Sequence, residues 1–227
     1  MTFILSAHSI KRSVTTKSGM LTIIDGVDLQ LKPGESIAIQ GASGSGKSTL
    51  LGILAGLDIP QQGKVELNGR NITELDEDQR AQLRAESVGF VFQSFYLIDD
   101  LTAKENVALP LELFQQKHAL KIAEDWLTRL GMEHRMNHYP RQLSGGEQQR
   151  VALCRAFSVQ PSILFADEPT ANLDTATARS VLDQLFSLQR KHNTSMVIAT
   201  HDQALASRCD RVLQLRSGRL SSKNHDS

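Results

Sequence analysis

Two patterns of apolar and polar residues follow one another along the chain. Short apolar runs that end in a polar residue or a turn predict strands at 36–40, 65–68, 88–93, 162–169, 195–202 and 211–218. Residues 21–41 predict short strands separated by two turns that contain glycine. Apolar residues at helical spacing fill 174–192 and much of 97–142. Strands that alternate with helices predict an α/β fold, with a mainly parallel sheet and helices on both of its faces.

The stretch 97–142 keeps the helical period throughout. Its clearest part, 119–131, is amphipathic and ends at Gly131, a residue suited to the end of a helix. The sequence contains no low-complexity linker and no repeat of fixed period. We therefore expect a single domain over 1–227, with an inserted helical lobe at about 97–142 and a polar tail at about 219–227.

Composition narrows the class of protein. The 227 residues include 25 basic and 25 acidic side chains, which argues against nucleic acid or an anionic membrane as the main partner. No window approaches the roughly 18 apolar residues of a membrane span. The N-terminus has its basic and apolar residues in the wrong order for a secretory signal. Cys154 and Cys209 have no metal-binding spacing, so we expect two reduced thiols in a cytosolic chain.

The run GASGSGKST lies between an apolar strand and an apolar helix and fits the pattern G-x-x-x-x-G-K-[ST]. Glycines let successive backbone N–H groups face one anion, and the helix N-terminus adds its positive end. Lys47 has the reach for β- and γ-phosphates, and the Ser48 hydroxyl is suited to Mg²⁺. The predicted phosphate-binding residues of this loop are Gly41, Ser43, Gly44, Ser45, Gly46, Lys47, Ser48 and Thr49.

Four further polar residues stand at the ends of predicted strands. Asp167 and Glu168 close one apolar run, which places one carboxylate for Mg²⁺ through water and the next for polarising an attacking water. Gln93 ends a second strand within reach of Mg²⁺, and His201 ends a third within reach of the γ-phosphate. Alone, an Asp-Glu pair at a strand end is more often a solvated turn, a glutamine there is usually without a special role, and a histidine there is more often structural. The hypothesis therefore rests on the set. The predicted catalytic residues are Glu168, His201, Gln93 and Lys47, and the predicted metal ligands are Ser48, Gln93 and Asp167.

A second glycine-rich helix start, LSGGEQQR, occupies 143–150. Ser144 is suited to an N-cap, and Gly145 and Gly146 expose backbone N–H groups, so this segment also predicts an anion site. A chain with two such sites raises the question of whose phosphate the second one holds. The spacing of the two loops does not require them to meet within one chain.

The order of these motifs, with NLD at 172–174 after the acidic pair, resembles the nucleotide-binding domain of ABC ATPases from end to end. LSGGEQQR matches the signature of that family and is far more specific than a phosphate loop. The resemblance implies a P-loop NTPase core with an N-terminal antiparallel β subdomain and an inserted helical lobe, acting as an ATPase on ATP with Mg²⁺. It also implies a head-to-tail dimer, in which Ser144, Gly145 and Gly146 bind the γ-phosphate on the partner's P-loop.

The runs AGLDIPQQGKVELNG and VGFVFQSFYLIDDLTAKENVALP are similar to ABC ATP-binding subunits of the lipoprotein-releasing and macrolide-exporting type, and especially to the YbbA-like group. This similarity implies an integral membrane permease as partner and cell-envelope or hydrophobic cargo. It also implies a place on the cytoplasmic face of the inner membrane. The apolar cluster Phe95, Tyr96 and Leu97 is either the docking site for that permease or core of the helical lobe.

One position departs from the family pattern. Such domains commonly carry an aromatic residue near the N-terminus that stacks on adenine, but the matching run here is Lys11-Arg12-Ser13-Val14. We therefore expect weaker ATP binding than in relatives and poor discrimination between ATP and GTP. The alternative is that Phe3 or His8 folds over the base instead.

Two other functions stay open. A soluble ABC ATPase of DNA maintenance or translation usually carries long coiled coils or a second ABC domain, and the sequence shows neither of these and no basic patch. An ATP-gated regulator of a cell-envelope enzyme, which moves no cargo, uses the same ATP chemistry. The sequence does not separate that regulator from a transporter subunit.

Overall fold

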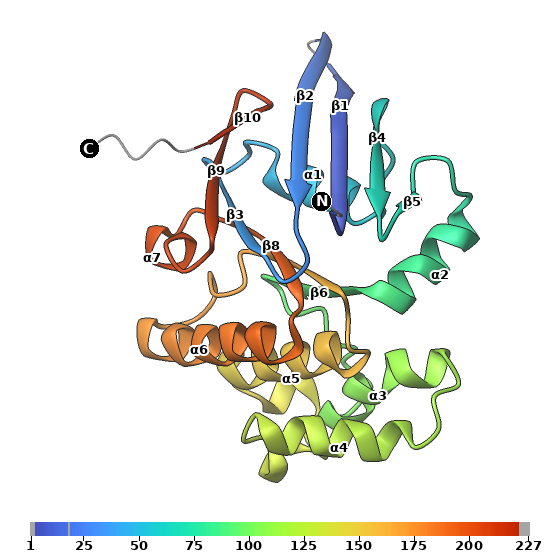
Figure 1. Ribbon diagram of the computed structural model, residues 1–227. Coiled ribbons are helices and arrows are strands. Elements are labelled where there is room, and N and C mark those ends of the chain that lie inside the picture. Colours follow the sequence, from blue (N-terminus) through green and yellow to red (C-terminus); the bar gives the residue numbers. More distant parts are fainter. Residues whose placement is uncertain (1–2, 18, 223–227) are drawn as a thin grey trace. The chain divides into compact units, whose positions relative to one another are not determined.

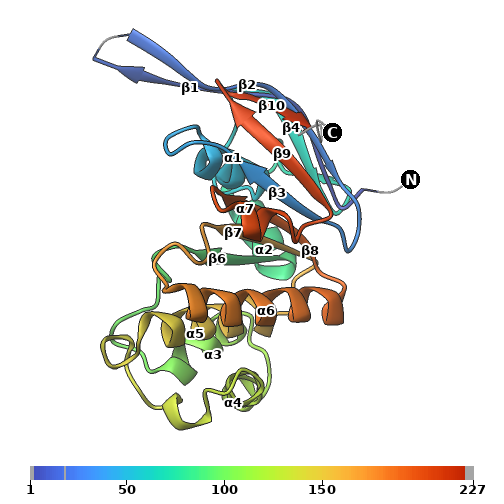
Figure 2. The same cartoon turned by 90° about the vertical axis from the view of Figure 1, so that its left-hand side faces the viewer.

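The computed structural model describes residues 3–17 and 19–222, and the chain divides into two compact units. Unit 1 comprises Met1–Arg84 and Ser195–Ser227, and unit 2 comprises Ala85–Thr194. Figures 1 and 2 together label the helices and strands of both units. None of the described helices is long and apolar enough to cross a lipid bilayer.

The first part of unit 1 is an antiparallel sheet with the strand order β2-β1-β4-β5. β1 (Leu5–Thr16) pairs with β2 (Gly19–Leu31) and with β4 (Gln62–Leu67), and β5 (Arg70–Asn71) pairs with β4. β4 follows β1 only as far as Lys11, so the rest of β1 and its partner β2 form a two-stranded ribbon, which projects in Figure 2. This sheet confirms the N-terminal antiparallel subdomain.

The second part of unit 1 is built on β3 (Ser36–Gln40), which pairs in parallel with β8 (Ser195–Thr200) and β9 (Arg211–Arg216). Every residue of β3 and β8 is buried, as expected for continuous apolar runs in a parallel sheet. α1 (Lys47–Leu54) follows β3, and the short α7 (Gln203–Ala206) follows β8. The carboxyl ends of β3 and β8 therefore carry the predicted phosphate loop and the predicted His201.

A tenth strand, β10 (Arg219–Ser222), occupies the first four residues of the predicted polar tail and pairs antiparallel with β9. The chain turns at Ser217 and Gly218, whose φ angles are 48° and 76°, as in the tight turns that favour hairpins. Arg219 then forms an ion pair with Asp25 of β2 at 2.9 Å. The turn and the ion pair explain the strand, and residues 223–227 of the predicted tail lie outside the described residues.

Unit 2 contains the parallel pair β6 (Val88–Phe92) and β7 (Ile163–Asp167) and a group of helices. α3 (Ala103–Leu113), α4 (Ala119–Arg129) and α5 (Gly145–Ser158) pack against one another, and α6 (Thr175–His192) packs on α5 (Figures 1 and 2). Short 3-10 turns lie at Glu133–Arg135 and Pro140–Gln142. The predicted lobe segment thus supplies α3, α4 and both turns.

One helix, α2 (Glu77–Ser87), is absent from the sequence prediction. Only Arg80 and Leu83 of this helix are buried, so it carries almost no apolar period. Its signal is a cap instead, because the Gln79 N–H donates to Asp76 Oδ1 at 2.9 Å and the Asp76 N–H donates back to Gln79 Oε1 at 3.1 Å. Asp followed three residues later by Gln is a pattern typical of a helix start, and it could have predicted α2.

Candidate nucleotide site

The loop between β3 and α1 is built to curve around an anion. Gly44 and Gly46 have φ angles of 74° and 97°, in the left-handed region that favours glycine. A Cβ on Gly46 would lie 2.8 Å from Ile23 Cγ2 of β2, so the position also lacks room for a side chain. α1 begins at Lys47 without a side-chain cap, which leaves its first backbone N–H groups for a ligand.

Lys47 is buried and lies along this loop. Its Nζ donates to the main-chain oxygens of Gly41 and Ala42, at 3.0 and 3.2 Å. The Ser45 hydroxyl is also buried, and it has no hydrogen-bond partner among the described residues. A buried hydroxyl without a partner is costly, and a phosphate oxygen would satisfy it. The donors that the loop presents therefore fit phosphate.

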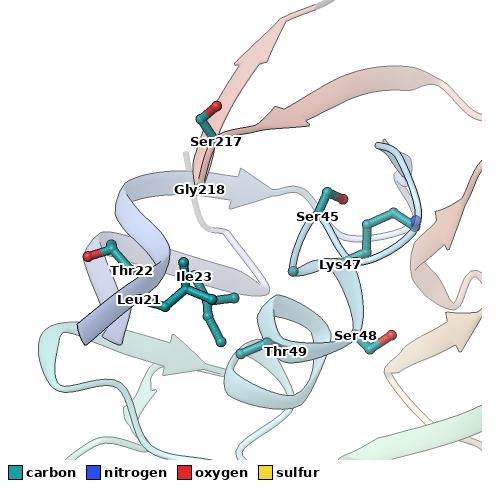
Figure 3. Close-up of a pocket in the computed structure, with 11 residues that line it drawn as sticks. Leu21, Thr22, Ile23, Ser45, Lys47, Ser48, Thr49, Ser217 and Gly218 are labelled. Carbon is teal, nitrogen blue, oxygen red and sulfur yellow. The ribbon is translucent and has the colours of Figure 1, made fainter. Parts of the chain in front are cut away.

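A cavity of about 350 Å³ opens beside the loop, as Figure 3 shows. Its walls are Leu21, Thr22 and Ile23 of β2, the segment 44–49, and the β9–β10 turn at 217–218. The hydroxyl of Thr22 points away from the loop (Figure 3), which leaves aliphatic groups on this wall. The cavity combines phosphate-type donors with an apolar side, as a nucleotide requires.

The aromatic residue that the family pattern places near the N-terminus is not found here. Ser13 lies opposite Thr22 in the β1–β2 register, and their hydroxyl oxygens are 3.2 Å apart. In the part of the chain that the structure describes, no aromatic residue lines the cavity. Phe3 and His8 line a different hollow, together with Leu29 and other residues. The structure therefore gives no support to Phe3 or His8 as a cover for the base.

His201 approaches the same loop from another side. It lines a hollow of about 710 Å³ together with Gly41, Ala42 and Ser45. Its turn is held by Asp202, whose N–H donates to Thr200 Oγ1 at 3.0 Å. Unit 1 thus brings the predicted phosphate loop and the predicted histidine together. The sequence pattern did not single out the other residues of this hollow, which are Gln40, Gln203, Gln214, Leu215, Arg216 and Ser217.

The predicted acidic pair lies at the carboxyl edge of β6 and β7 in unit 2. Phe92 is opposite Asp167 in the parallel register, so Gln93 and Glu168 leave their strands at the same edge. Asp167 Oδ1 is buried and has no hydrogen-bond partner within the described ranges, and a carboxylate oxygen in that state fits hydrated Mg²⁺. Glu168 has a φ of 45°, which is uncommon outside glycine and is typical of functional positions.

Gln93 is also tied to a residue that the sequence pattern gave no role of its own. Asn172 Nδ2 donates to the main-chain oxygen of Gln93 at 3.0 Å, and Gln93 Nε2 donates to Asn172 Oδ1 at 3.3 Å. The NLD motif marked this segment, but nothing in it indicated a bond to a residue 79 positions away. The amide of Asn172 thus belongs to the same edge as Gln93, Asp167 and Glu168.

The second glycine-rich segment forms the start of α5, as predicted. Ser144 is the N-cap and forms a capping box with Glu147, whose Oε2 accepts from the Ser144 N–H at 2.8 Å and from its hydroxyl at 3.0 Å. A Cβ on Gly146 would collide with the Thr177 methyl group of α6, so this glycine allows the two helices to approach closely. The segment has the backbone of an anion site, and its serine hydroxyl is bonded within the chain.

The apolar cluster Phe95, Tyr96 and Leu97 divides between a buried and an exposed part. Tyr96 is 62% exposed, whereas Phe95 is half-buried, and its ring would lie 3.8 Å from a Cβ added at Gly145. Phe95 and Tyr96 have φ angles of 60° and 46°, and Arg155 of α5 donates to both of their main-chain oxygens, at 2.7 and 2.5 Å. Arg155, which the sequence pattern did not indicate, holds this loop to the signature helix.

The predicted site residues are distributed over both units. Unit 1 holds the phosphate loop with its Ser48 and the nearby His201. Unit 2 holds Gln93, Asp167 and Glu168 at one strand edge and, at the start of α5, the signature residues Ser144, Gly145 and Gly146. The donors of the phosphate loop suit phosphate. The oxygen atoms at the β6–β7 edge suit a metal and a nucleophilic water, and the start of α5 has the backbone of an anion site.

Comparison with known proteins agrees with this chemistry. A family model described as ABC transporter matches residues 24–171. The chain is 53% identical over 219 residues to the uncharacterized ABC transporter ATP-binding protein YbbA of Escherichia coli K12, with 96% of each chain covered. It is 45% identical over 219 residues to the lipoprotein-releasing system ATP-binding protein LolD of Hahella chejuensis, with 96% of this chain and 95% of LolD covered.

Solved structures place the fold in the same group. The dimeric, post-hydrolysis state of the ATP-binding cassette MJ0796, bound to ADP and Pi, aligns with a TM-score of 0.89 and 36% sequence identity. The alignment covers 96% of this chain and 98% of that one. The predicted fold class, a P-loop core with an antiparallel β subdomain and helical elements, is confirmed.

Proposed function

Because the chain belongs to the ABC transporter family and is an ATPase of its ATP-binding type, we propose that it drives a membrane complex as a head-to-tail dimer. The partner is a separate integral permease that handles cell-envelope or hydrophobic cargo, and the chain acts on the cytoplasmic face of the inner membrane. The observation that carries the proposal is the pair of glycine-rich helix starts in one chain, at Gly46 and Ser144. The dimer of MJ0796 and the name of LolD support it.

In this proposal the loop 41–49 holds the phosphates of ATP. Ser45 Oγ, which is buried without a partner among the described residues, donates to a phosphate oxygen. Lys47 exchanges its bonds to the main-chain oxygens of Gly41 and Ala42 for the β- and γ-phosphates. The uncapped start of α1 adds backbone N–H donors. Together these groups stabilise the negative charge of the triphosphate.

Ser48, Gln93 and Asp167 are the proposed ligands of Mg²⁺, with Asp167 acting through water. Mg²⁺, when bound, neutralises charge on the β- and γ-phosphates. The Oδ1 of Asp167 is buried and has no hydrogen-bond partner among the described residues. This atom and the amide oxygen of Gln93 are of the type that the ion prefers. Glu168 polarises the attacking water, and His201 donates to the γ-phosphate from its place beside the phosphate loop.

The signature segment is proposed to serve the other copy. Ser144, Gly145 and Gly146 bind the γ-phosphate held by the partner's loop, through the hydroxyl and the N–H groups at the start of α5. One complete site then needs two chains. We expect the specific ATPase activity to rise with protein concentration in the dilute range. Constant specific activity down to concentrations at which sizing shows a monomer would contradict the shared site.

The docking surface for the permease is proposed at Tyr96, which is exposed, rather than at Phe95, which lies against the signature loop. The bonds from Arg155 hold this loop in a left-handed backbone that presents Tyr96 outward. Tyr96→Asp should abolish co-purification with an integral membrane protein, whereas Phe114→Asp, at an exposed aromatic of the same unit, should not. If wild-type chain purified from membranes brings no integral protein, a soluble ABC ATPase becomes the better assignment.

A further inference from the structure

Two side-chain amides close a small ring at the edge of unit 2 where β6 and β7 end. Asn172 Nδ2 donates to the main-chain oxygen of Gln93 at 3.0 Å, and Gln93 Nε2 donates to Asn172 Oδ1 at 3.3 Å. The ring joins the residue that follows β6 to the loop that follows Glu168. Both side chains are exposed, so burial does not hold either amide in place, and these bonds set how the amides are oriented.

The chemistry of the ring determines which way each amide faces. A main-chain carbonyl oxygen only accepts hydrogen bonds, so the Asn172 group beside it has to be the NH₂ group. Asn172 Oδ1 therefore faces Gln93, and because this oxygen also only accepts, it selects the NH₂ group of Gln93. Gln93 Oε1 is left on the side of the amide away from Asn172.

This orientation matters because Mg²⁺ binds oxygen ligands and is not bound by an amide NH₂ group. A glutamine amide that is free to turn presents its oxygen and its nitrogen about equally. We propose that Asn172 is a positioning residue that holds the NH₂ group of the Gln93 amide, so that the amide oxygen is the atom left for a metal. The inference rests on the proposed role of Gln93 as a ligand of Mg²⁺.

The loop that carries Asn172 is suited to hold an orientation. It begins with a turn in which the Ala171 N–H donates to the Glu168 main-chain oxygen at 3.2 Å. It ends at the N-cap of α6, where Asp174 accepts from the Thr177 N–H at 3.0 Å. The ring is thus closed between a strand end on one side and a capped helix start on the other, which limits the movement of Asn172.

The test measures metal binding by the full chain with a non-hydrolysable ATP analogue, using Mn²⁺ in place of Mg²⁺ and paramagnetic resonance to count free ion. Asn172→Ala should raise the Kd for Mn²⁺ about three- to tenfold, the worth of one neutral hydrogen bond. Binding of the analogue in the presence of a chelator should not change, because the proposed role acts through the metal alone. An unchanged Kd for Mn²⁺ would overturn the inference.

Two backgrounds separate positioning from a merely structural effect. In Gln93→Ala there is no amide to orient, and in Gln93→Glu both side-chain oxygens are ligands, so orientation is irrelevant. Asn172→Ala should therefore add no penalty to Mn²⁺ binding in either background. A penalty of the same size in both would mean that Asn172 acts through the fold and would overturn the inference.

The proposed function is tested separately by the single variant Gln93→Ala. If it weakens Mn²⁺ binding while Asn172→Ala does not, the metal site stands and the positioning role fails. If Gln93→Ala leaves Mn²⁺ binding unchanged, Gln93 is not a ligand, and both the metal site as proposed and the role of Asn172 are overturned.

Discussion

The two glycine-rich helix starts are alike in sequence and differ in structure. α1 starts after Gly46, which has a φ of 97° and provides no side-chain cap. α5 starts after Ser144, which shares a capping box with Glu147. The first start leaves its backbone donors and a buried lysine for a ligand. The second has already bonded its serine N–H and hydroxyl to Glu147 within the chain, and only the N–H groups of its glycines are left for a ligand.

Glu147 explains the difference. Its carboxylate lies at the N-terminus of α5 and pairs with Arg135 at 2.8 Å. Partial burial acts to raise the pKa of Glu147, but the bonds from Arg135 and Ser144 outweigh it, and the net pKa is lowered. The first turn of α5 therefore carries a negative charge, whereas the first turn of α1 contains no acidic residue. We therefore expect the loop 41–49 to bind phosphate before the signature segment does.

The largest expected effects come from the residues at the nucleotide itself. Glu168→Gln should bind ATP and lose hydrolysis by roughly 10²–10⁴-fold, the usual worth of a positioned general base. The ATP that is not hydrolysed should then hold two chains together, as sizing in the presence of ATP would show. Lys47→Ala is the matched variant, because it weakens phosphate binding and should give no such dimer. Normal turnover by Glu168→Gln would remove Glu168 from its proposed role.

A smaller effect is expected at the second helix start. Ser144→Ala should weaken ATP-dependent dimerisation about 10–100-fold, since a hydrogen bond to a charged phosphate is lost. Binding of ATP to the single chain should be unaffected, which separates the signature segment from the loop 41–49. Thr102→Ala removes the cap of the similar capping box at α3 and serves as control. If both variants weaken the dimer equally, the effect belongs to helix capping and not to phosphate.

The next prediction concerns how the cavity beside the loop 41–49 recognises the nucleotide base. Ser13→Tyr should restore a stacking surface near Thr22 and tighten ATP binding by up to about tenfold. Thr15→Tyr, at an exposed position farther along β1, is the control. The wild-type complex should discriminate poorly between ATP and GTP in kcat/KM. A preference for ATP above about a hundredfold would mean that another group reads adenine.

The smallest effect concerns the charge of Glu147. Because its pKa is lowered in the folded chain, its carboxylate stabilises the fold above the ordinary value of about 4.3, and this contribution is lost as the pH falls through the folded pKa. Glu147→Gln should melt about 1–3 °C below wild type at neutral pH, and the gap should close in acid. Glu105→Gln tests the capping box of α3. The pKa of Glu105 is lowered mainly by its hydrogen bonds from Thr102, with a smaller effect of Lys104, so the variant should show a smaller gap. A gap that persists at low pH would mean that charge is not the cause.

Much of the fold could be predicted from the spacing of apolar residues along the sequence. The buried strands β3, β7 and β8 fall within the predicted apolar runs, because a strand covered on both sides needs a continuous apolar segment. α6 lies where the helical period predicted it. The preceding helix α4 ends near Gly131 as predicted, because the left-handed φ of 71° at this position favours glycine. α2 was missed since it buries only Arg80 and Leu83 and so carries no period.

Part of the candidate site could likewise be predicted from local sequence, and part could not. The loop 41–49 and the cap at Ser144 were predictable, because glycine conformation and helix capping depend on residues within a few positions of one another. The bond between Asn172 and Gln93 was not, and neither were the bonds from Arg155 to Phe95 and Tyr96. These partners are 59 to 79 positions apart, so no local pattern relates them.

The sequence by itself determined the phosphate loop and the signature, because each is a contiguous motif whose backbone requirements are local. The order of these motifs along the chain then indicated the family. The use made of those motifs depends on packing. The parallel register of β6 and β7 brings Gln93 to the edge where Glu168 leaves its strand, and Ile23 of β2 leaves no space for a side chain at Gly46. Such pairings come from strand register and helix packing. These join segments that are far apart in the chain, so a short sequence motif cannot predict them.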